Sequence, residues 1–238
     1  MVPLKKTKIN SIAKKVINLE IEALRLLKKS IDRNFDKAVN AIINCQSKII
    51  LCGVGKSGLI AAKIASTMSS VGSPSFSLSA NDCLHGDMGS ISKKDLLILI
   101  SNSGKSEELL PIIKFANRNK VKLIGIVSKK NSSLYKGSDI KILLPETQEA
   151  GLGVVPTSST SIQLAIGDAL AIAALNKKQF NKNDFSKLHP GGNLGKQLKT
   201  VEDLMVTKNK VPFILESKNL KEAINIITQK KLGVLIAK

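Results

Sequence analysis

Residues 95–108 read DLLILISNSGKSEE, an apolar run followed at once by a turn that is rich in hydroxyl groups. The next residues, LLPIIKFA, have the apolar spacing of a helix. A buried strand that leads through such a turn into a helix points hydroxyl and backbone N–H groups at one spot, which is how protein chains bind phosphate. The sequence therefore predicts a phosphorylated small molecule as the ligand.

Two further stretches have the same character. The apolar run 48–54 precedes GKSG at 55–58 and then a helical run, and the cluster TSST at 157–160 opens a helix that extends to about Leu175. Serine or threonine at a helix start is often only a capping residue, and for each cluster taken alone this interpretation is as good as a functional one. Three such helix starts in one chain favour a binding site.

Strand-like and helical patterns alternate after a helical N-terminal segment. The predicted strands are residues 48–54, 74–78, 95–100, 122–128 and 140–145, and the helical runs between them include 57–71 and 106–117. This alternation predicts an α/β fold in three layers, with a central parallel five-stranded sheet flanked by helices. Ligands bind such sheets at the carboxyl ends of the strands, where both GKSG and SNSGKS fall.

The chain divides into three predicted parts. Residues 1–46 are helices whose wide apolar face needs a partner surface, either on the following domain or in an oligomer interface. Residues 47–198 form the α/β domain. Residues 199–238 have a turn–strand–helix–strand pattern and are too few to fold alone, so they are expected to pack on a partner or to belong to a longer module.

Composition excludes several classes of partner. The 238 residues carry a formal charge of +19, but only three of the 37 basic residues are arginines and aromatic residues make up 3% of the chain. Without aromatic residues among the basic ones there is no stacking platform for bases, so no nucleic acid is expected. The high lysine content is interpreted as a bias of the overall composition and not as a binding surface. The positive field would still attract anionic substrates.

Hydropathy and cysteine content predict a soluble cytoplasmic protein. The longest apolar stretch, 164–175, is interrupted by Asp168 and is too short to cross a membrane. The N-terminus has no apolar core of a secretory signal. The three cysteines, Cys45, Cys52 and Cys83, show no metal-like spacing, which fits a reducing compartment.

Five motifs in a fixed order resemble those of one known family. They are GVGKSG at 53–58, HGDMG at 85–89, SNSGKSEE at 101–108, PTSST at 156–160 with GDALA at 167–171, and HPGGNLG at 189–195. Together they closely resemble the arabinose-5-phosphate isomerases, over about residues 10–238. That family joins a sugar isomerase (SIS) domain to a pair of CBS repeats, and it interconverts D-ribulose 5-phosphate and D-arabinose 5-phosphate for Kdo and lipopolysaccharide biosynthesis.

The resemblance implies a set of site residues and no cofactor. The implied catalytic residues are Lys56, Glu108, Glu149 and His189. The implied or expected substrate-binding residues are Ser57, Gly72, Ser73, His85, Ser101, Asn102, Ser103, Ser106, Thr157, Ser158, Ser159 and Thr160. The choice of proton-abstracting base stays open, with Glu149 or His189 preferred over Glu108, which lies where a carboxylate simply favours a helix dipole.

The chain departs from the family pattern at three points. Ser79 stands where the family often has a zinc-associated histidine, so no metal is expected. The loop after Glu149 is one residue shorter than usual. Residues 199–238 resemble only part of the first CBS repeat, so nucleotide regulation is not expected from this chain.

The family resemblance also suggests a homotetramer with sites shared between subunits.

Two interpretations remain beside the isomerase. A non-catalytic SIS-domain sensor of sugar phosphates, or an isomerase acting on another sugar phosphate, would show the same phosphate-binding motifs. Regulators of the sensor kind commonly carry a helix-turn-helix ahead of the SIS domain, and residues 1–46 offer one long helix and a short one without a glycine turn.

Overall fold

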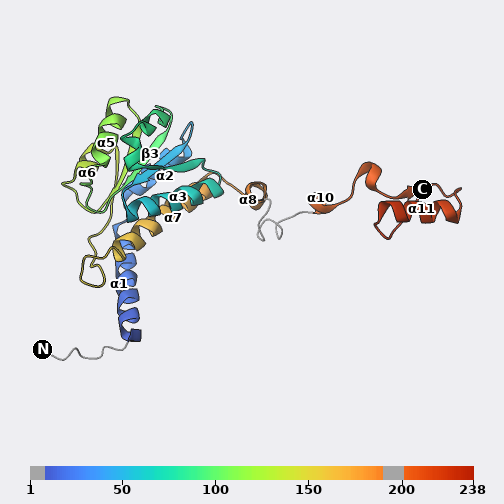
Figure 1. The fold of residues 1–238 in the computed structure, drawn as a ribbon, viewed down its shortest axis with the longest axis horizontal. Helices are drawn as coiled ribbons and strands as arrows, with labels where there is room; N and C mark the ends of the chain where they lie inside the picture. The colour runs from blue at the N-terminus through green and yellow to red at the C-terminus, as the bar shows by residue number, and fades with distance from the viewer. Residues whose placement is uncertain (1–8, 190–200) are drawn as a thin grey trace. The chain divides into compact units, whose positions relative to one another are not determined.

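The computed structural model describes residues 9–189 and 201–238. The chain divides into two compact units, Met1–Leu188 and His189–Lys238 (Figure 1). The predicted boundary at residue 198 and most of the HPGGNLG motif lie outside the described residues. The division into parts at 46 and 198 therefore stays a prediction.

The first unit is built on a parallel sheet (Figure 1). Its strands are β1 (Ile49–Gly53), β2 (Ser75–Ser79), β3 (Leu96–Ile100), β4 (Lys122–Val127) and β5 (Ile140–Leu143), in the order β2-β1-β3-β4-β5. Every residue of β1 and β3 is buried, as expected for central strands that are covered on both faces. The predicted α/β fold with a central parallel five-stranded sheet is confirmed.

Helices cover both faces of this sheet. They are α1 (Ile9–Ser30), α2 (Arg33–Ile43), α3 (Lys56–Ser70), α4 (Ala80–Cys83), α5 (Leu109–Arg118), α6 (Ser133–Gly137) and α7 (Ser158–Lys177), with a 3₁₀ turn at Asp87–Ser90. Helix α8 (Lys182–Leu188) follows α7 and has no buried residue. Because side chains alternate along a strand, Leu51 and Ile98 pack against α1, α2, α3 and α7, whereas Cys52 and Leu97 pack against α4, α5 and α6. The result is a helix–sheet–helix arrangement of three layers.

Helix α7 is a core helix. Among the described residues it is the one helix that is long and apolar enough to cross a membrane, but half of that stretch is buried inside the protein. Ile162, Ile166 and Leu170 of α7 belong to the same apolar core as β1 and β3. Burial inside the first unit accounts for the apolar composition of this helix.

The second unit contains α10 (Val201–Leu204), a 3₁₀ turn (Lys208–Lys210), β6 (Phe213–Ile214), α11 (Leu220–Lys230) and β7 (Ile236–Ala237). Strands β6 and β7 pair in parallel, so this unit has the strand–helix–strand pattern of the sequence. Asn219 and Glu222 form a capping box that begins α11. The assignment of this unit to part of a CBS repeat stays a prediction.

Candidate active site

The order of the strands makes a topological switch point between β1 and β3. From β1 the chain passes through α3 to β2 on one side, and from β3 it passes through α5 to β4 on the other side. The loops after β1 and β3 therefore leave neighbouring strand ends in opposite directions, which is where parallel sheets bind ligands. Gly53 is paired with Ile100 in the sheet, so GKSG and SNSGKS leave from adjacent positions.

The loop after β3 is a compact hydroxyl-rich turn. The Ser101 side chain is buried; its Oγ accepts a hydrogen bond from Gly104 N at 3.0 Å and lies 3.1 Å from Ser106 Oγ. Gly104 has φ +63°, and a Cβ there would lie 2.3 Å from Ser132 Oγ. A glycine is therefore required to close the turn. The exposed Ser103 accepts a hydrogen bond from Lys105 N at 3.2 Å.

The loop after β1 presses the first turn of α3 against the end of the strand. A Cβ on Gly53 would lie 2.8 Å from the backbone carbonyl group of Ser57, and one on Gly58 would lie 2.9 Å from the carbonyl oxygen of Gly53. Lys56 is the first residue of α3 and is exposed. The amino end of a helix and a lysine side chain both attract anions, so this turn suits a phosphate or a developing oxyanion.

Glu149 holds the start of α7. Its Oε2 accepts hydrogen bonds from Thr157 N at 2.8 Å, Thr157 Oγ1 at 3.1 Å and Ser159 N at 3.3 Å. Burial alone would raise the pKa of this carboxyl group, but hydrogen bonds from Ser159 and Thr157 outweigh it and lower the pKa below its usual value. Glu149 is therefore ionised at neutral pH.

The four residues of TSST at 157–160 are buried or partly buried. Ser158 and Ser159 are buried, and Ser158 Oγ has no hydrogen-bond partner within the described residues. Thr160 Oγ1 donates to Thr157 O at 2.8 Å. Thr157, at the N-cap position, makes no side-chain capping bond to α7, so the cluster offers one unpartnered hydroxyl group and no side-chain cap.

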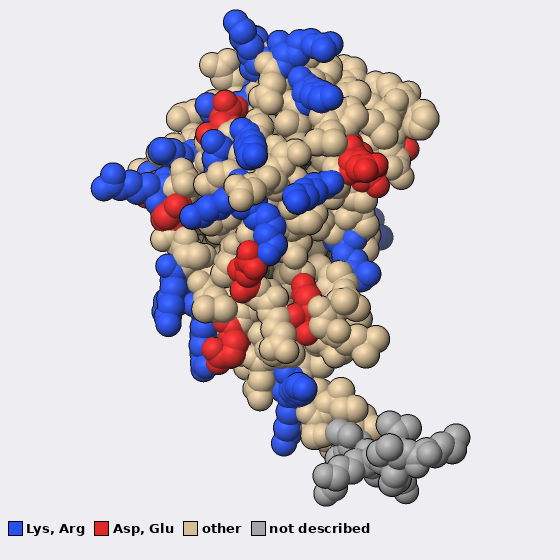
Figure 2. Space-filling model, turned by 90° about the vertical axis from the view of Figure 1, so that its left-hand side faces the viewer, with Lys and Arg blue, Asp and Glu red and all other residues tan. Residues whose placement is uncertain are grey.

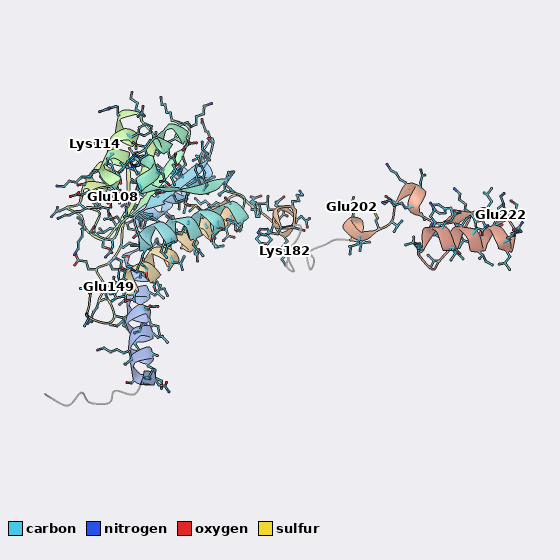
Figure 3. The ribbon with its side chains drawn as sticks, in the orientation of Figure 1. Glu108, Lys114, Glu149, Lys182, Glu202 and Glu222 are labelled. Atoms are coloured by element: carbon cyan, nitrogen blue, oxygen red, sulfur yellow. The ribbon has the colours of Figure 1, made fainter. Side chains whose placement is uncertain are left out.

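Glu108 and Glu149 lie on different parts of the first unit (Figure 3). Glu108 precedes α5, is partly buried, and makes no side-chain capping bond to that helix. Glu149 lies in the loop beside α1, where a cavity of about 570 Å³ is lined by residues of both, among them Ile12, Lys15 and Leu152.

Gly72 and Ser73 lie at the opposite end of the strands from the loops after β1 and β3. They precede β2 and so lie at the amino ends of the strands. Lys56, Ser57 and Ser101 follow β1 and β3 and so lie at the carboxyl ends, on the opposite side of a parallel sheet. Ser73 is fully buried and accepts a hydrogen bond from Lys178 Nζ at 2.9 Å. Within one chain the structure does not bring Gly72 and Ser73 to the loops after β1 and β3, and their substrate contact stays a prediction.

The two histidines have different settings. His85 is exposed between α4 and the following 3₁₀ turn. A cavity of about 510 Å³ lies next to that segment, lined by Gly55, Leu59, Asp82 and Asp87 among others. His189 begins the second unit, so the structure does not relate it to the strand ends.

Two other polar side chains bear on the site. Asn102 Oδ1 accepts a hydrogen bond from Ser128 Oγ at 2.5 Å, which ties the loop after β3 to the end of β4. Gln163 of α7 accepts a hydrogen bond from Ser57 Oγ at 3.1 Å. Sequence reasoning missed Gln163, and its one signal was an amide within the apolar run SIQLAIGDALAIAAL.

Two further features of the described residues are their possible metal ligands and their surface charges. No group of three or more His, Cys, Asp or Glu side chains that could hold a metal ion occurs in the described part of the chain. On the face shown in Figure 2, lysine and arginine side chains are spread over the surface with acidic side chains between them.

Comparison with known proteins gives consistent relatives. Residues 42–173 match the model of the SIS domain family. The arabinose 5-phosphate isomerase KdsD of Yersinia pestis is 40% identical over 94% of this chain and 69% of its own length. Among solved structures, an Escherichia coli CFT073 protein in complex with arabinose 5-phosphate has a TM-score of 0.75 and 34% identity, covering 79% of this chain and all of that one. A putative sugar-phosphate isomerase of Listeria monocytogenes has a TM-score of 0.76 and 29% identity over the same share of each chain.

Proposed function

Since the chain belongs to the SIS-domain family and is an isomerase, we propose that it interconverts D-ribulose 5-phosphate and D-arabinose 5-phosphate through an enediol intermediate. The observation that carries this proposal is the similarity to arabinose 5-phosphate isomerases over 94% of the chain. A structural relative in complex with arabinose 5-phosphate supports the substrate class. The phosphate-suited loops after β1 and β3 supply the physical basis.

The reaction needs a grip on the phosphate, a group that stabilises an oxyanion and a base. We assign the grip to the loop after β3, with Ser101, Ser103 and Ser106, and to Ser57 at the start of α3. Lys56 carries the positive charge that stabilises the enediolate oxygen, and stabilisation of this kind often contributes most to the rate enhancement. His85 binds substrate oxygens, and Glu108 extends toward the sugar.

The base is Glu149 or His189. A carboxylate that is ionised at neutral pH can accept the proton from the carbon next to the carbonyl group. However, the hydrogen bonds that lower the pKa of Glu149 also make it a weaker base than a carboxylate whose pKa burial has raised toward neutrality. This property favours His189 as the base, since an imidazole side chain can also accept the proton.

We further propose a homotetramer in the cytoplasm whose product feeds Kdo and lipopolysaccharide biosynthesis. Apolar side chains on α1 and on the loop beside it are unusually exposed, among them Ile9 at 82%, Ile17 at 57% and Leu152 at 91%. Contiguous exposed apolar side chains of this kind mark contact surfaces. In a tetramer a second copy could complete sites whose parts lie apart within one chain, such as Gly72 and Ser73.

The activity is tested by direct assay. The purified chain is expected to produce arabinose 5-phosphate from ribulose 5-phosphate, with product identified by nuclear magnetic resonance. Unphosphorylated ribulose is the matched control and should react at least about 100-fold more slowly, because the phosphate contacts orient the substrate. Binding of ribulose 5-phosphate without turnover would instead identify a sensor, and turnover of a different sugar phosphate only would identify another isomerase.

The assembly is tested by light scattering after gel filtration. The wild-type chain is expected at about four times its monomer mass, and Ile17→Glu is expected to lower that mass, because a charge would enter the apolar contact. Lys14→Glu on the same exposed helix is the control for the charge change and should leave the mass unchanged. A wild-type protein that stays monomeric at micromolar concentration would contradict the tetramer.

A further inference from the structure

A polar side chain lies within the buried face of α7. Gln163 is 1% exposed, and its Oε1 accepts a hydrogen bond from Ser57 Oγ at 3.1 Å. Its other amide atom, Nε2, is buried and has no hydrogen-bond partner within the described part of the chain. A buried amide donor without a partner costs free energy that an apolar side chain of the same size would not. Packing alone does not account for glutamine at this position.

The position of Gln163 is fixed by the close contact of α3 and α7, which run side by side in Figure 1. One turn after Gln163 on the same side of α7 is Gly167, where a Cβ would lie 2.2 Å from Ile64 Cδ1 of α3. Ile64 is itself buried and lies on the same side of α3 as Ser57. The two helix backbones therefore hold the Gln163 amide against the first turn of α3.

The orientation of the Gln163 amide decides whether the hydroxyl proton of Ser57 is available to an anion. A hydroxyl group has one proton, and an ionised phosphate oxygen only accepts hydrogen bonds. In the observed arrangement the Ser57 proton points to Gln163 Oε1 and is not available to an anion. A half-turn of the amide exchanges two atoms of similar size, and the hydrogen-bond partners decide which orientation is populated. After that turn Nε2 can donate to Ser57 Oγ, and the Ser57 proton is released.

We propose that Gln163 is a positioning residue for phosphate binding: when a phosphate monoester binds, Gln163 Nε2 donates to Ser57 Oγ and Ser57 donates to a phosphate oxygen. The two hydrogen bonds then polarise each other in a site of low dielectric. The unpartnered donor of the free protein is thus the group that the bound state uses. This inference rests on the proposed function for the class of ligand, a phosphate monoester, but not for the sugar.

The test is a double-mutant cycle with inorganic phosphate as the probe. Dissociation constants are measured by calorimetry for the wild type, Ser57→Ala, Gln163→Leu and the double variant. Each single variant is expected to bind phosphate about tenfold more weakly, the effect of one hydrogen bond to a charged group. The double variant should bind about as weakly as either single variant, because both changes remove the same chain of hydrogen bonds. For ribulose 5-phosphate, KM should rise by a similar factor while kcat changes less than about threefold.

Thermal unfolding separates this role from a structural one. Gln163→Leu is expected to unfold at or above the wild-type temperature, because it removes a buried unpaired donor, while it binds phosphate more weakly. Asn176→Leu removes an exposed amide near the other end of α7 and should change neither property. Wild-type phosphate affinity in Gln163→Leu, losses that multiply in the double variant, or a loss of affinity that follows a lower unfolding temperature would each overturn the proposal.

The same probe keeps this inference separate from the reaction. A wild-type protein that binds phosphate but does not isomerise ribulose 5-phosphate would contradict the proposed function, and the coupling of Ser57 and Gln163 would still be measured. A wild-type protein that binds no inorganic phosphate would overturn the role of Gln163.

Discussion

Gly53→Ala is expected to lower kcat/KM for ribulose 5-phosphate by about 100-fold, because a displacement of about 1 Å at a positioned site can cost that much. The added Cβ would lie 2.8 Å from the carbonyl carbon and oxygen of Ser57 and 2.9 Å from Gly58 N. All three are backbone atoms, so no side chain can rotate away. The first turn of α3, which carries Lys56 and Ser57, must move away from the end of β1.

Stability is measured alongside activity, because overpacking of this kind costs about 1–3 kcal/mol. Gly58→Ala makes the same contact from the other side, 2.9 Å from Gly53 O, and should show the same loss. Gly89→Ala is the matched control: its Cβ would meet nothing within 4 Å, and activity should stay within about twofold of wild type. Wild-type activity in Gly53→Ala would show that the contact between β1 and α3 does not hold the site.

The strands and helices of the first unit could be predicted closely from the sequence. The apolar run 95–100 is β3 at Leu96–Ile100, and 122–128 is β4 at Lys122–Val127. Such runs are reliable because strands buried on both faces have no polar positions to blur the pattern. The start of α5 was predicted at residue 106 but lies at Leu109, because the hydroxyl groups of Ser101 and Ser106 close a turn there.

The site was predictable only in part. Hydroxyl-rich helix starts indicated the loops after β1 and β3, because parallel strands bring those loops to one edge. Sequence could not show that Glu149 bonds the first turn of α7, nor that Gln163 reaches Ser57 from another helix. Both depend on how two segments far apart in the chain pack, which no local pattern records.

At the amino ends of the strands, opposite the candidate site, a buried carboxylate stabilises the fold. Asp95 is 2% exposed; Lys48 Nζ donates to its carboxylate oxygens at 3.1 and 3.2 Å, and Ser92 N donates at 2.6 Å. Burial alone would raise the pKa of Asp95, but hydrogen bonds from Ser92, Ser47 and Lys48 outweigh it and lower the pKa from 3.8 to about 2. The charged form is therefore favoured in the folded state.

Asp95→Asn is expected to lower the free energy of unfolding at pH 7 by about 2–3 kcal/mol. The NH₂ group of asparagine would face the N–H groups of Lys48 and Ser92, which are themselves donors, and the negative charge would be lost. Since the folded pKa lies below the unfolded one, the carboxylate stabilises the wild type above about pH 4 and loses that contribution as the pH falls toward about 2. Urea unfolding between pH 7 and 2 should therefore show a decline in the wild type that is smaller by this amount in the variant. Asp168→Asn is the control, since its pair with Lys63 at 2.5 Å is about 40% exposed and should contribute less than about 1 kcal/mol. Equal losses in the two variants, or the same pH dependence in Asp95→Asn as in the wild type, would show that the Asp95 carboxylate does not stabilise the folded state.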